Sequence, residues 1–265
     1  MRLINTSTLL PEEFFGQSPP PYAILSHTWG LEEVSYHDLR EGFAKLQQFC
    51  QQASADGFQY CWMDTCCIDK SNASELSEAI NSHFAWYQGS SVCHVYLKDV
   101  KFEDGHITDE PNIKRLEQAR WFTRGWTLQE LIAPTHVVFF DLGWQRIGTK
   151  AGLAFTLQLI TGVSQSYLSG GVSQSALALC SVAERMSWAA KRSTTRVEDI
   201  AYCLVGLFNV RMSVLYGEGT RAFWRLQREI LKGTTDQSLL AWRSPEAHTM
   251  PGPSCDAAKN YADLS

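Results

Sequence analysis

The sequence predicts an α/β protein with a mostly parallel sheet flanked by helices and a C-terminal helical extension. Over the first 143 residues, short apolar segments alternate with segments of helical spacing, which is typical of parallel strands joined by helices. Beyond residue 143 only helical patterns follow. A hydrophobic content of 45% and a charged content of 19% in 265 residues are sufficient for a substantial core.

Residues 1–143 are predicted to form the α/β core. Four apolar runs are the expected strands, at residues 22–29, 58–69, 91–100 and 135–141. Apolar side chains at helical spacing predict helices over residues 42–55, 74–87 and 119–134. The acidic segment 101–111 contains Gly and Pro, which favours an exposed loop.

Residues 144–243 are predicted to form the helical extension. Its helical segments cover residues 153–160, 176–190, 197–207 and 222–232, with glycines between several of them. Because these segments have no strands of their own, we expect them to pack on the sheet. Residues 244–265 are rich in Pro, Ser and Ala and are predicted to be a linker or a disordered tail.

Composition and charge argue against several classes of protein. A net charge of -5 without a basic patch argues against a nucleic-acid partner. No secretory signal is visible and no apolar run approaches the roughly 20 residues of a membrane span, so we expect a soluble, cytoplasmic protein without a membrane partner. The eight cysteines lack the paired spacing of a zinc site and are interpreted as buried thiols, so no metal is expected.

Polar residues gather where the expected strands end. Ligands of an open parallel sheet bind beyond the carboxyl ends of its strands. This rule selects Ser26, His27, Thr28, Trp29, Asp64, Thr65, Asp69, Lys98, Asp99, Arg120, Trp121 and Arg124. Simpler roles stay open, with His27 as a hydrogen-bonded loop residue and Asp64 or Asp69 as a cap of the next helix. His83 and His94 lack partners at metal-ligand spacing and are interpreted as core or surface histidines.

Glu130 is unusual because it is a carboxylate in a strongly apolar segment. On the predicted helix Trp126 and Glu130 are i and i+4, so one lies above the other on the same face. An aromatic ring beside a carboxylate in an apolar wall suits a flat, positively charged ligand. The alternative is an ion pair of Glu130 with Arg120 or Arg124 that attaches the helix to the sheet.

Three blocks in order, "PPYAILSHTWG", "FQYCWMDTCCIDK" and "ARWFTRGWTLQELIAP", resemble the signature blocks of the fungal HET (heterokaryon incompatibility) domain. The run from Arg196 to Leu231 looks like the segment that follows in members joined to a nucleotide-binding, repeat-bearing receptor. The HET domain is itself considered similar to the TIR domain. "GWTLQEL" matches the TIR element in which a tryptophan is followed, after three residues, by a glutamate. The resemblance therefore implies a TIR-like (flavodoxin-like) core.

The resemblance also implies a function. HET domains trigger cell death when genetically different fungal cells fuse, and the matching glutamate of TIR enzymes is the catalytic residue of NAD+ cleavage. Carried over by motif, this role falls on Glu130, and the loop Ser26–Trp29 lines the nicotinamide side. Trp29 or Trp126 would stack on a base or on the pyridinium ring, and Arg120 or Arg124 would meet the pyrophosphate. NAD+ is then the substrate, and no cofactor is expected.

Two hypotheses follow from the resemblance. The first is an NAD+ hydrolase that acts as a cell-death effector on oligomerisation. The second is a non-catalytic module that recruits a death effector. Both imply self-association through TIR-like interfaces and a receptor region C-terminal to the domain. The segment 101–111 and the extra C-terminal helices depart from compact TIR domains and leave the shape of the ligand pocket open.

Overall fold

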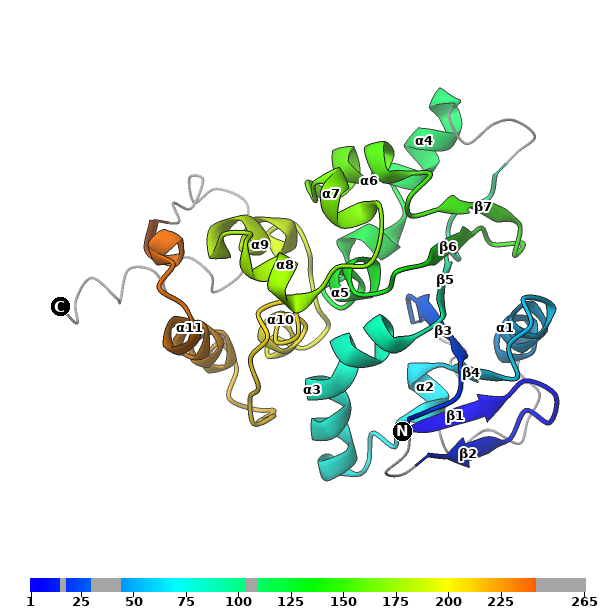
Figure 1. Cartoon of the computed structure of the whole chain (residues 1–265), viewed down its shortest axis with the longest axis horizontal. Coiled ribbons are helices and arrows are strands. Elements are labelled where there is room, and N and C mark those ends of the chain that lie inside the picture. The colour runs from blue at the N-terminus through cyan, green and yellow to red at the C-terminus, as the bar shows by residue number, and fades with distance from the viewer. Residues whose placement is uncertain (15–17, 30–43, 103–108, 242–265) are drawn as a thin grey trace.

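The computed structural model describes residues 1–14, 18–29, 44–102 and 109–241. They contain a seven-stranded sheet in the order β2-β1-β4-β3-β5-β6-β7 (Figure 1). The four central strands are parallel: β4 (Tyr60–Trp62), β3 (Tyr22–His27), β5 (Val92–Tyr96) and β6 (Val137–Phe140). The predicted α/β class with a mostly parallel sheet is therefore confirmed.

Strand β3 lies in the middle of the sheet and ends in polar residues. All six of its residues are buried, as expected for a strand with helices on both faces. Its last two residues, Ser26 and His27, pair in parallel register with Val95 and Tyr96 of β5. Because successive side chains of a strand point to opposite faces of the sheet, Ser26 and His27 lie on different faces.

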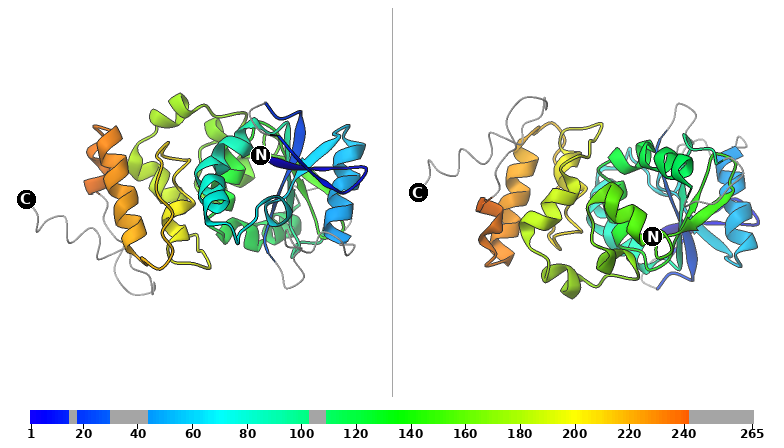
Figure 2. Two further views of the ribbon diagram at one scale, coloured as in Figure 1. Left: turned by 90° about the horizontal axis from the view of Figure 1, so that it is seen from below. Right: turned by 90° about the horizontal axis from the view of Figure 1, so that it is seen from above.

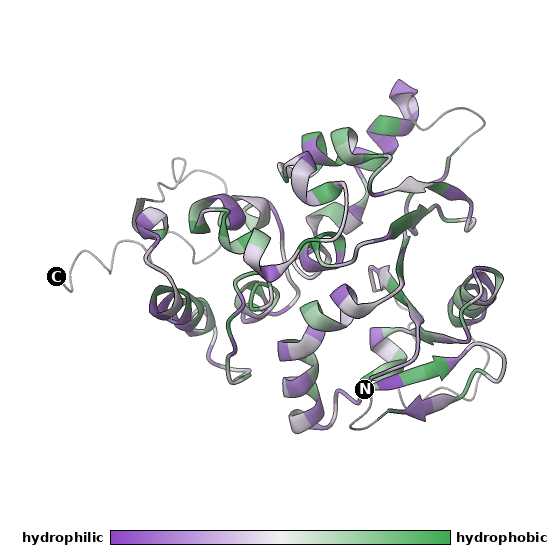
Figure 3. Cartoon of the chain, viewed as in Figure 1, coloured by the Kyte–Doolittle hydropathy of each residue, from purple (hydrophilic) through white to green (hydrophobic). Residues whose placement is uncertain are grey.

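The sequence analysis does not predict three antiparallel strands at the edges of the sheet. They are β1 (Arg2–Asn5), β2 (Pro11–Glu13) and β7 (Arg146–Thr149). Each is three or four residues long, and β2 and β7 lack an apolar run, so no strand pattern develops. Figure 3 shows β2 as mainly hydrophilic beside the more hydrophobic β1. The sheet thus continues beyond residue 143.

Helices cover both faces of the sheet (Figure 2). Helix α1 (Ala44–Ala55) lies on one face, and α3 (Ala73–Gly89) lies on the other. Both agree with the predicted helices, although residues 42 and 43 lie outside the described residues. The Asn72 side chain caps α3 by accepting hydrogen bonds from the backbone N–H groups of Ser74 and Glu75, at 3.0 and 3.2 Å.

The strand expected over residues 58–69 ends early. It stops at Trp62, and α2 (Asp64–Cys67) follows, with the N–H groups of Cys66 and Cys67 bonded to Met63 O. Asp64 in this first turn favours a helix start, because a carboxylate is stabilised near a helix N-terminus. Only residues 101–102 and 109 of the expected loop over 101–111 are described outside helices, since α4 (Glu110–Glu117) begins at Glu110.

The single helix expected over residues 119–134 is wrong. The segment forms a short 3-10 helix, η2 (Arg120–Thr123), and then α5 (Thr127–Ile132). Between them the chain pairs with Ser193, whose N–H bonds Thr123 O at 2.7 Å and whose C=O accepts from Gly125 N at 2.9 Å. A Cβ on Gly125 would lie 2.6 Å from Thr194 Cγ2, so this close approach requires glycine. Pro134 follows the end of α5, where it blocks continuation.

The chain beyond β7 is helical and forms further layers. Its elements are α6 (Ala154–Thr161), α7 (Gln165–Leu168), α8 (Gln174–Ala178), α9 (Val182–Ala189), α10 (Asp199–Tyr202), α11 (Arg221–Gly233) and η3 (Gln237–Ala241). Helices α6 and α11 agree with the predicted segments. The helix expected over 176–190 is divided, because the Ser181 side chain caps a new helix start at α9. The helix expected over 197–207 extends only through α10, and residues 242–265, with the whole of the expected tail, lie outside the described residues.

Helices α8 to α11 lie against the helical layer of the core, which separates them from the sheet (Figure 2). Asn81 of α3 donates a hydrogen bond to Met212 O at 3.0 Å, and Gln88 donates one to Val172 O at 2.8 Å. Gly206 lies against Phe84 of α3 and Gln129 of α5. In the part of the chain described, no helix has the length and apolarity to cross a membrane.

Candidate functional site

The carboxylate of Glu130 is the centre of a buried polar cluster at the carboxyl end of β3. Ser26 Oγ donates a hydrogen bond to Glu130 Oε2, and Trp121 Nε1 of η2 donates to Ser26 Oγ at 2.7 Å. On the other carboxylate oxygen, His83 Nε2 of α3 lies 3.2 Å from Glu130 Oε1. Glu130 is only 6% exposed, so these groups replace the water that a free carboxylate would bind. We call Ser26, His83, Trp121 and Glu130 the carboxylate cluster.

Aromatic rings enclose the carboxylate cluster. The ring centre of His83 lies 4.8 Å from that of Tyr87, 5.1 Å from Trp126 and 6.2 Å from Trp62. Tyr87 donates its hydroxyl to Leu25 O at 2.8 Å, and burial together with the charge of Glu130 raises its pKa well above the usual value. An apolar enclosure strengthens every electrostatic interaction of the carboxylate.

Neither arginine that the sequence analysis considered as a partner of Glu130 forms an ion pair with it in the described part of the chain. Arg124 Nη2 donates to Thr195 Oγ1 at 3.0 Å, and the backbone N–H of Arg120 donates to Asp99 Oδ2 at 2.8 Å. The ion-pair alternative is thus wrong. It assumed one continuous helix, whereas the break at Gly125 separates both arginines from the helix that carries Glu130.

A second cluster lies where β3 and β4 end. His27 Nε2 lies 3.1 Å from Asp64 Oδ1, and Trp29 Nε1 donates to Asp64 Oδ2 at 3.0 Å. Lys70 Nζ lies 3.3 Å from Asp64 Oδ2 and 3.6 Å from the centre of the Trp29 ring. Burial alone would raise the pKa of Asp64, but the charges of Lys70 and His27 outweigh burial and hold that pKa well below its usual range. We call these four residues the edge cluster.

The structure divides the residues that were predicted to form one site. Ser26 joins Glu130, and Trp126 lies beside it through His83, whereas His27, Trp29 and Asp64 form the edge cluster. Thr28 is buried at the end of β3. Asp69 serves the turn before α3, where its Oδ1 accepts from Ser71 N at 2.9 Å and from Ser71 Oγ at 2.6 Å.

His83 is not expected from the sequence to be a site residue, because it has no partner at metal-ligand spacing. Its position on α3 carries a signal, because it shares the buried face of the helix with Ile80, Phe84 and Tyr87. A titratable ring on an apolar helix face needs a polar partner, and that partner is 47 residues away in the chain. Trp121 is recognised as lying near the ligand edge, but its hydrogen bond to Ser26 links residues 95 positions apart.

Buried groups also hold the C-terminal end of α5. Lys150 Nζ donates to Pro134 O and lies 3.5 Å from Ile132 O. Cys93 Sγ on β5 lies 3.9 Å from Glu130 O. Burial lowers the pKa of Lys150 from its usual 10.5 to about 8, and raises that of Cys93 well above its usual value.

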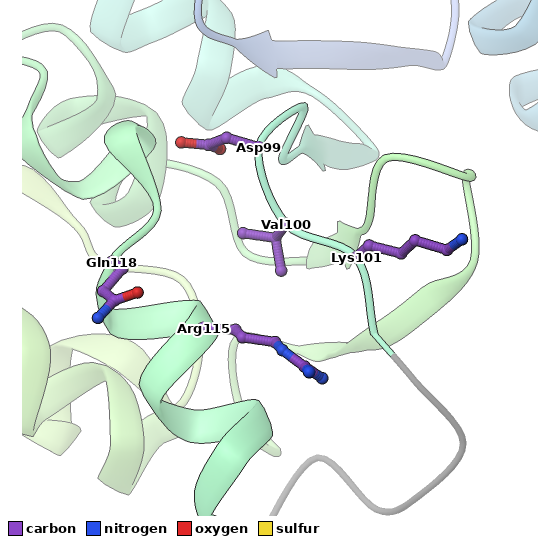
Figure 4. A pocket seen from close by; sticks show the side chains of 5 residues that line it. All are labelled: Asp99, Val100, Lys101, Arg115 and Gln118. Carbon is purple, nitrogen blue, oxygen red and sulfur yellow. The ribbon is translucent and has the colours of Figure 1, made fainter.

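A pocket of about 290 Å³ lies beside the end of β5. Figure 4 shows Asp99, Val100 and Lys101 on one side, and Arg115 and Gln118 of the α4 region on the other. No residue of the carboxylate cluster or of the edge cluster lines it. Within the described ranges, no group of three or more His, Cys, Asp or Glu residues is arranged to hold a metal ion.

The fold and the carboxylate cluster define an α/β domain with a buried glutamate at the ligand edge of its sheet. Residues 22–108 match the family model of the heterokaryon incompatibility protein (HET). The chain is 48% identical over 224 residues to the vegetative incompatibility protein HET-E-1 of Podospora anserina. These two findings support a fungal HET domain in this chain. The match covers 80% of the chain but spans only 16% of the length of HET-E-1.

Two further comparisons bear on the rest of the chain. Residues 221–263, which begin with α11, match a domain of unknown function, DUF8212. No solved structure matches the chain significantly. Ser26 and His83 lie within the residues matched by the HET family model, whereas Glu130 lies beyond them.

Proposed function

We propose that this chain is a cell-death effector domain of fungal heterokaryon incompatibility that hydrolyses NAD+ with Glu130 as its catalytic carboxylate. The likeness to HET-E-1 and to the HET family supports the biological role. The same likeness supports a receptor region elsewhere in the full-length protein, and we propose that the domain acts in the cytoplasm.

The burial and the contacts of Glu130 support the enzymatic part of the proposal. An isolated buried carboxylate is costly, yet Glu130 is buried at the sheet edge where α/β proteins bind ligands. Its nearest partners are a hydroxyl and an imidazole. No guanidinium or ammonium contacts it directly in the described part of the chain, which supports a role toward a cationic substrate.

The parallel strands support the TIR-like part of the proposal. Numbered along the chain, β3, β4, β5 and β6 are the first to fourth parallel strands, and they lie in the order 2-1-3-4. Flavodoxin-like sheets begin with this order, and their ligand site lies between the first and third strands. Ser26 stands at the end of the first parallel strand, beside the third.

The proposed reaction breaks the bond between nicotinamide nitrogen and ribose C1′. The bonding electrons leave with the nitrogen, which makes nicotinamide neutral and leaves an oxocarbenium-like cation on the ribose. Glu130 stabilises that cation, and water adds to C1′ and releases a proton. Because the leaving group is already cationic, no acid is needed to protonate it.

The neighbouring residues have proposed supporting roles. Ser26 and Trp121 fix one oxygen of Glu130 through consecutive hydrogen bonds. Trp126 offers an aromatic face to the pyridinium ring, and Trp29, at 51% exposure, offers one to the adenine. Arg120 and Arg124 stay proposed contacts of the pyrophosphate, alongside Lys70 of the edge cluster.

The decisive experiment compares the full chain with its Glu130→Gln variant after both are clustered on an oligomerising fusion partner. We expect the native protein to release nicotinamide from NAD+ and the variant to lose at least about a hundredfold in rate, because the amide lacks the charge that meets the cation. Glu198→Gln is the matched control. Glu198 is also a buried glutamate, but it caps the turn at Gly217 and Gly219. Equal release by all three proteins, or none from a clustered native sample, rules out the hydrolase.

A second function, non-catalytic assembly, is favoured by the closure of the site. Both oxygens of Glu130 are engaged, and the residue is only 6% exposed in this conformation. A scaffold needs no substrate to reach this carboxylate. Cell death that persists with Glu130→Gln at native expression would support assembly over catalysis.

A further inference from the structure

Arg192 is a residue of the helical extension whose buried guanidinium lies at the start of α5. It lies in the turn after α9 and is 9% exposed. Its Nη1 donates to Arg124 O at 2.9 Å and to Thr127 Oγ1 at 2.8 Å, and its Nε donates to Trp188 O at 3.3 Å. The guanidinium thereby joins α9 to the first turn of the helix that carries Glu130.

The charge of Arg192 has no direct counter-ion among the described residues. Its Nη2 is buried and has no hydrogen-bond partner there. Burial lowers the pKa of Arg192 to about 10, while Cys203 and Glu130 act in the opposite direction. Burial also raises the pKa of Cys203, so this thiol is neutral, and Glu130 is the carboxylate among the groups that act on the pKa of Arg192.

We propose that Arg192 is a positioning residue for Glu130, which orients the first turn of α5 and supplies the compensating positive charge for the buried carboxylate. The inference rests on the proposed function in one respect, namely that Glu130 is catalytic. It also assigns part of the site to the helical extension.

An arginine suits this position better than any other cation. Its planar fork donates to three acceptors from two nitrogens in fixed directions, whereas an ammonium group carries all its donors on one atom. Thr127 Oγ1 in turn donates to Trp121 O at 2.6 Å, which extends the connection to the tryptophan that bonds Ser26. The guanidinium therefore supports two routes to Glu130, through α5 itself and through Trp121.

Other groups act on Glu130 from the elements packed around it. They are His83 and Tyr87 of α3, Cys93 of β5, and Arg124 before α5. Cys93 and Tyr87 have raised pKa values and are neutral near pH 7. Arg124 is partly exposed, so water screens its charge more than that of the buried Arg192.

Kinetics of the clustered full chain provide the first test. We expect Arg192→Met to lower kcat for NAD+ at least about tenfold with KM changed less than about twofold, because the carboxylate is misplaced while substrate contacts stay. Arg192→Lys should restore part of kcat, since it keeps the charge but not the fork. We also expect Arg192→Met to move the acid limb of the pH–rate profile to higher pH. A raised KM with unchanged kcat contradicts positioning.

Arg185 offers a matched control. It is another buried arginine of α9, but it donates to Leu207 O at 3.1 Å and stacks on Phe208, away from α5. Rates are compared per folded molecule, with the folded fraction measured by circular dichroism. After its rates are divided by the folded fraction, Arg185→Met should have the native kcat and the native pH profile. An equal loss of kcat in both variants contradicts a specific role of Arg192.

A double-mutant cycle tests Arg192 even if the chain does not cleave NAD+. We measure urea midpoints for Arg192→Met, Glu130→Gln and the double variant, and the same set with Arg185→Met. If Arg192 compensates Glu130, the urea midpoint of the double variant of these two residues falls by less than the sum of the two single decreases. In the set with Arg185→Met, the decreases in midpoint are additive. Additive midpoints for Arg192 and Glu130 overturn the inference. Absent cleavage by the native chain, by contrast, rejects only the hydrolase.

Discussion

At the residue scale, the buried carboxylate of Glu130 is stable only because hydrogen bonds replace its lost water. Ser26 is central to this arrangement, since its hydroxyl donates to Glu130 and accepts from the Trp121 indole. The indole thereby fixes the direction in which the serine proton points. If one of these donors is removed by substitution, the group that it bonds is free to rotate.

We expect Trp121→Phe to lower the free energy of unfolding by about 1–2 kcal/mol and to reduce NAD+ cleavage, because it removes the donor to Ser26 but keeps an aromatic ring. Urea denaturation and nicotinamide release measure the two effects. Trp144→Phe is the control. Its indole Nε1 is buried without a hydrogen-bond partner among the described residues, so its removal costs no hydrogen bond. Equal effects of the two substitutions would contradict the role of the indole donor.

At the element scale, α5 is a six-residue helix held at both ends by buried cations. Arg192 acts at its first turn, and Lys150 donates to the carbonyls of Ile132 and Pro134 at its C-terminal end. Such a short helix is not stable by itself, so its orientation depends on these tertiary contacts. Both cations come from the chain beyond residue 143.

Lys150 makes stability depend on pH in a defined direction. Its pKa is about 8 in the folded protein and 10.5 when unperturbed, so between these values the unfolded chain binds more protons than the folded one. We therefore expect its contribution to the free energy of unfolding to rise across this window, by about 3 kcal/mol in total. The rise is measured as native minus Lys150→Met in urea denaturation at a series of pH values, which removes the titration of other groups. A constant difference would contradict it.

Sequence patterns predict the central strands of the sheet but miss its edge strands. The apolar runs around Ile24, Val95 and Phe139 mark central strands because both of their faces are buried. The edge strands β2 and β7 depend on pairing with a neighbour, which a three- or four-residue polar segment does not reveal. Likewise the Trp126–Glu130 spacing singles out Glu130, which the structure places in the buried carboxylate cluster. Its partners Ser26 and His83 follow only from tertiary packing across 104 and 47 residues.

At the scale of the whole molecule, core and helical extension share one tight interface. A Cβ on Gly206 would lie 2.2 Å from Phe84 Cβ and 2.8 Å from Gln129 Oε1. The side chains of α3 and α5 therefore meet the extension at van der Waals distance. Since α5 carries Glu130, we expect a looser interface to disturb the carboxylate cluster.

We expect Gly206→Ala to lower the free energy of unfolding by about 1–3 kcal/mol, because neither the Phe84 stem nor the adjacent helix has room to withdraw. The urea transition should shift as a single step monitored by circular dichroism and by tryptophan fluorescence. Gly170→Ala is the control, since nothing lies within 4 Å of its added Cβ. A shift confined to one of the two probes would show that core and extension unfold independently.

The outermost strand β2 has a consequence for how copies of this domain gather. It is three residues long, begins with Pro11 and continues with Glu12 and Glu13. A proline offers no N–H to an incoming strand, and charged side chains repel a second copy of the same edge. Strand-by-strand fibre growth from this edge is therefore disfavoured. If the domain clusters as proposed, we expect the contacts between copies to use faces of the molecule other than β2.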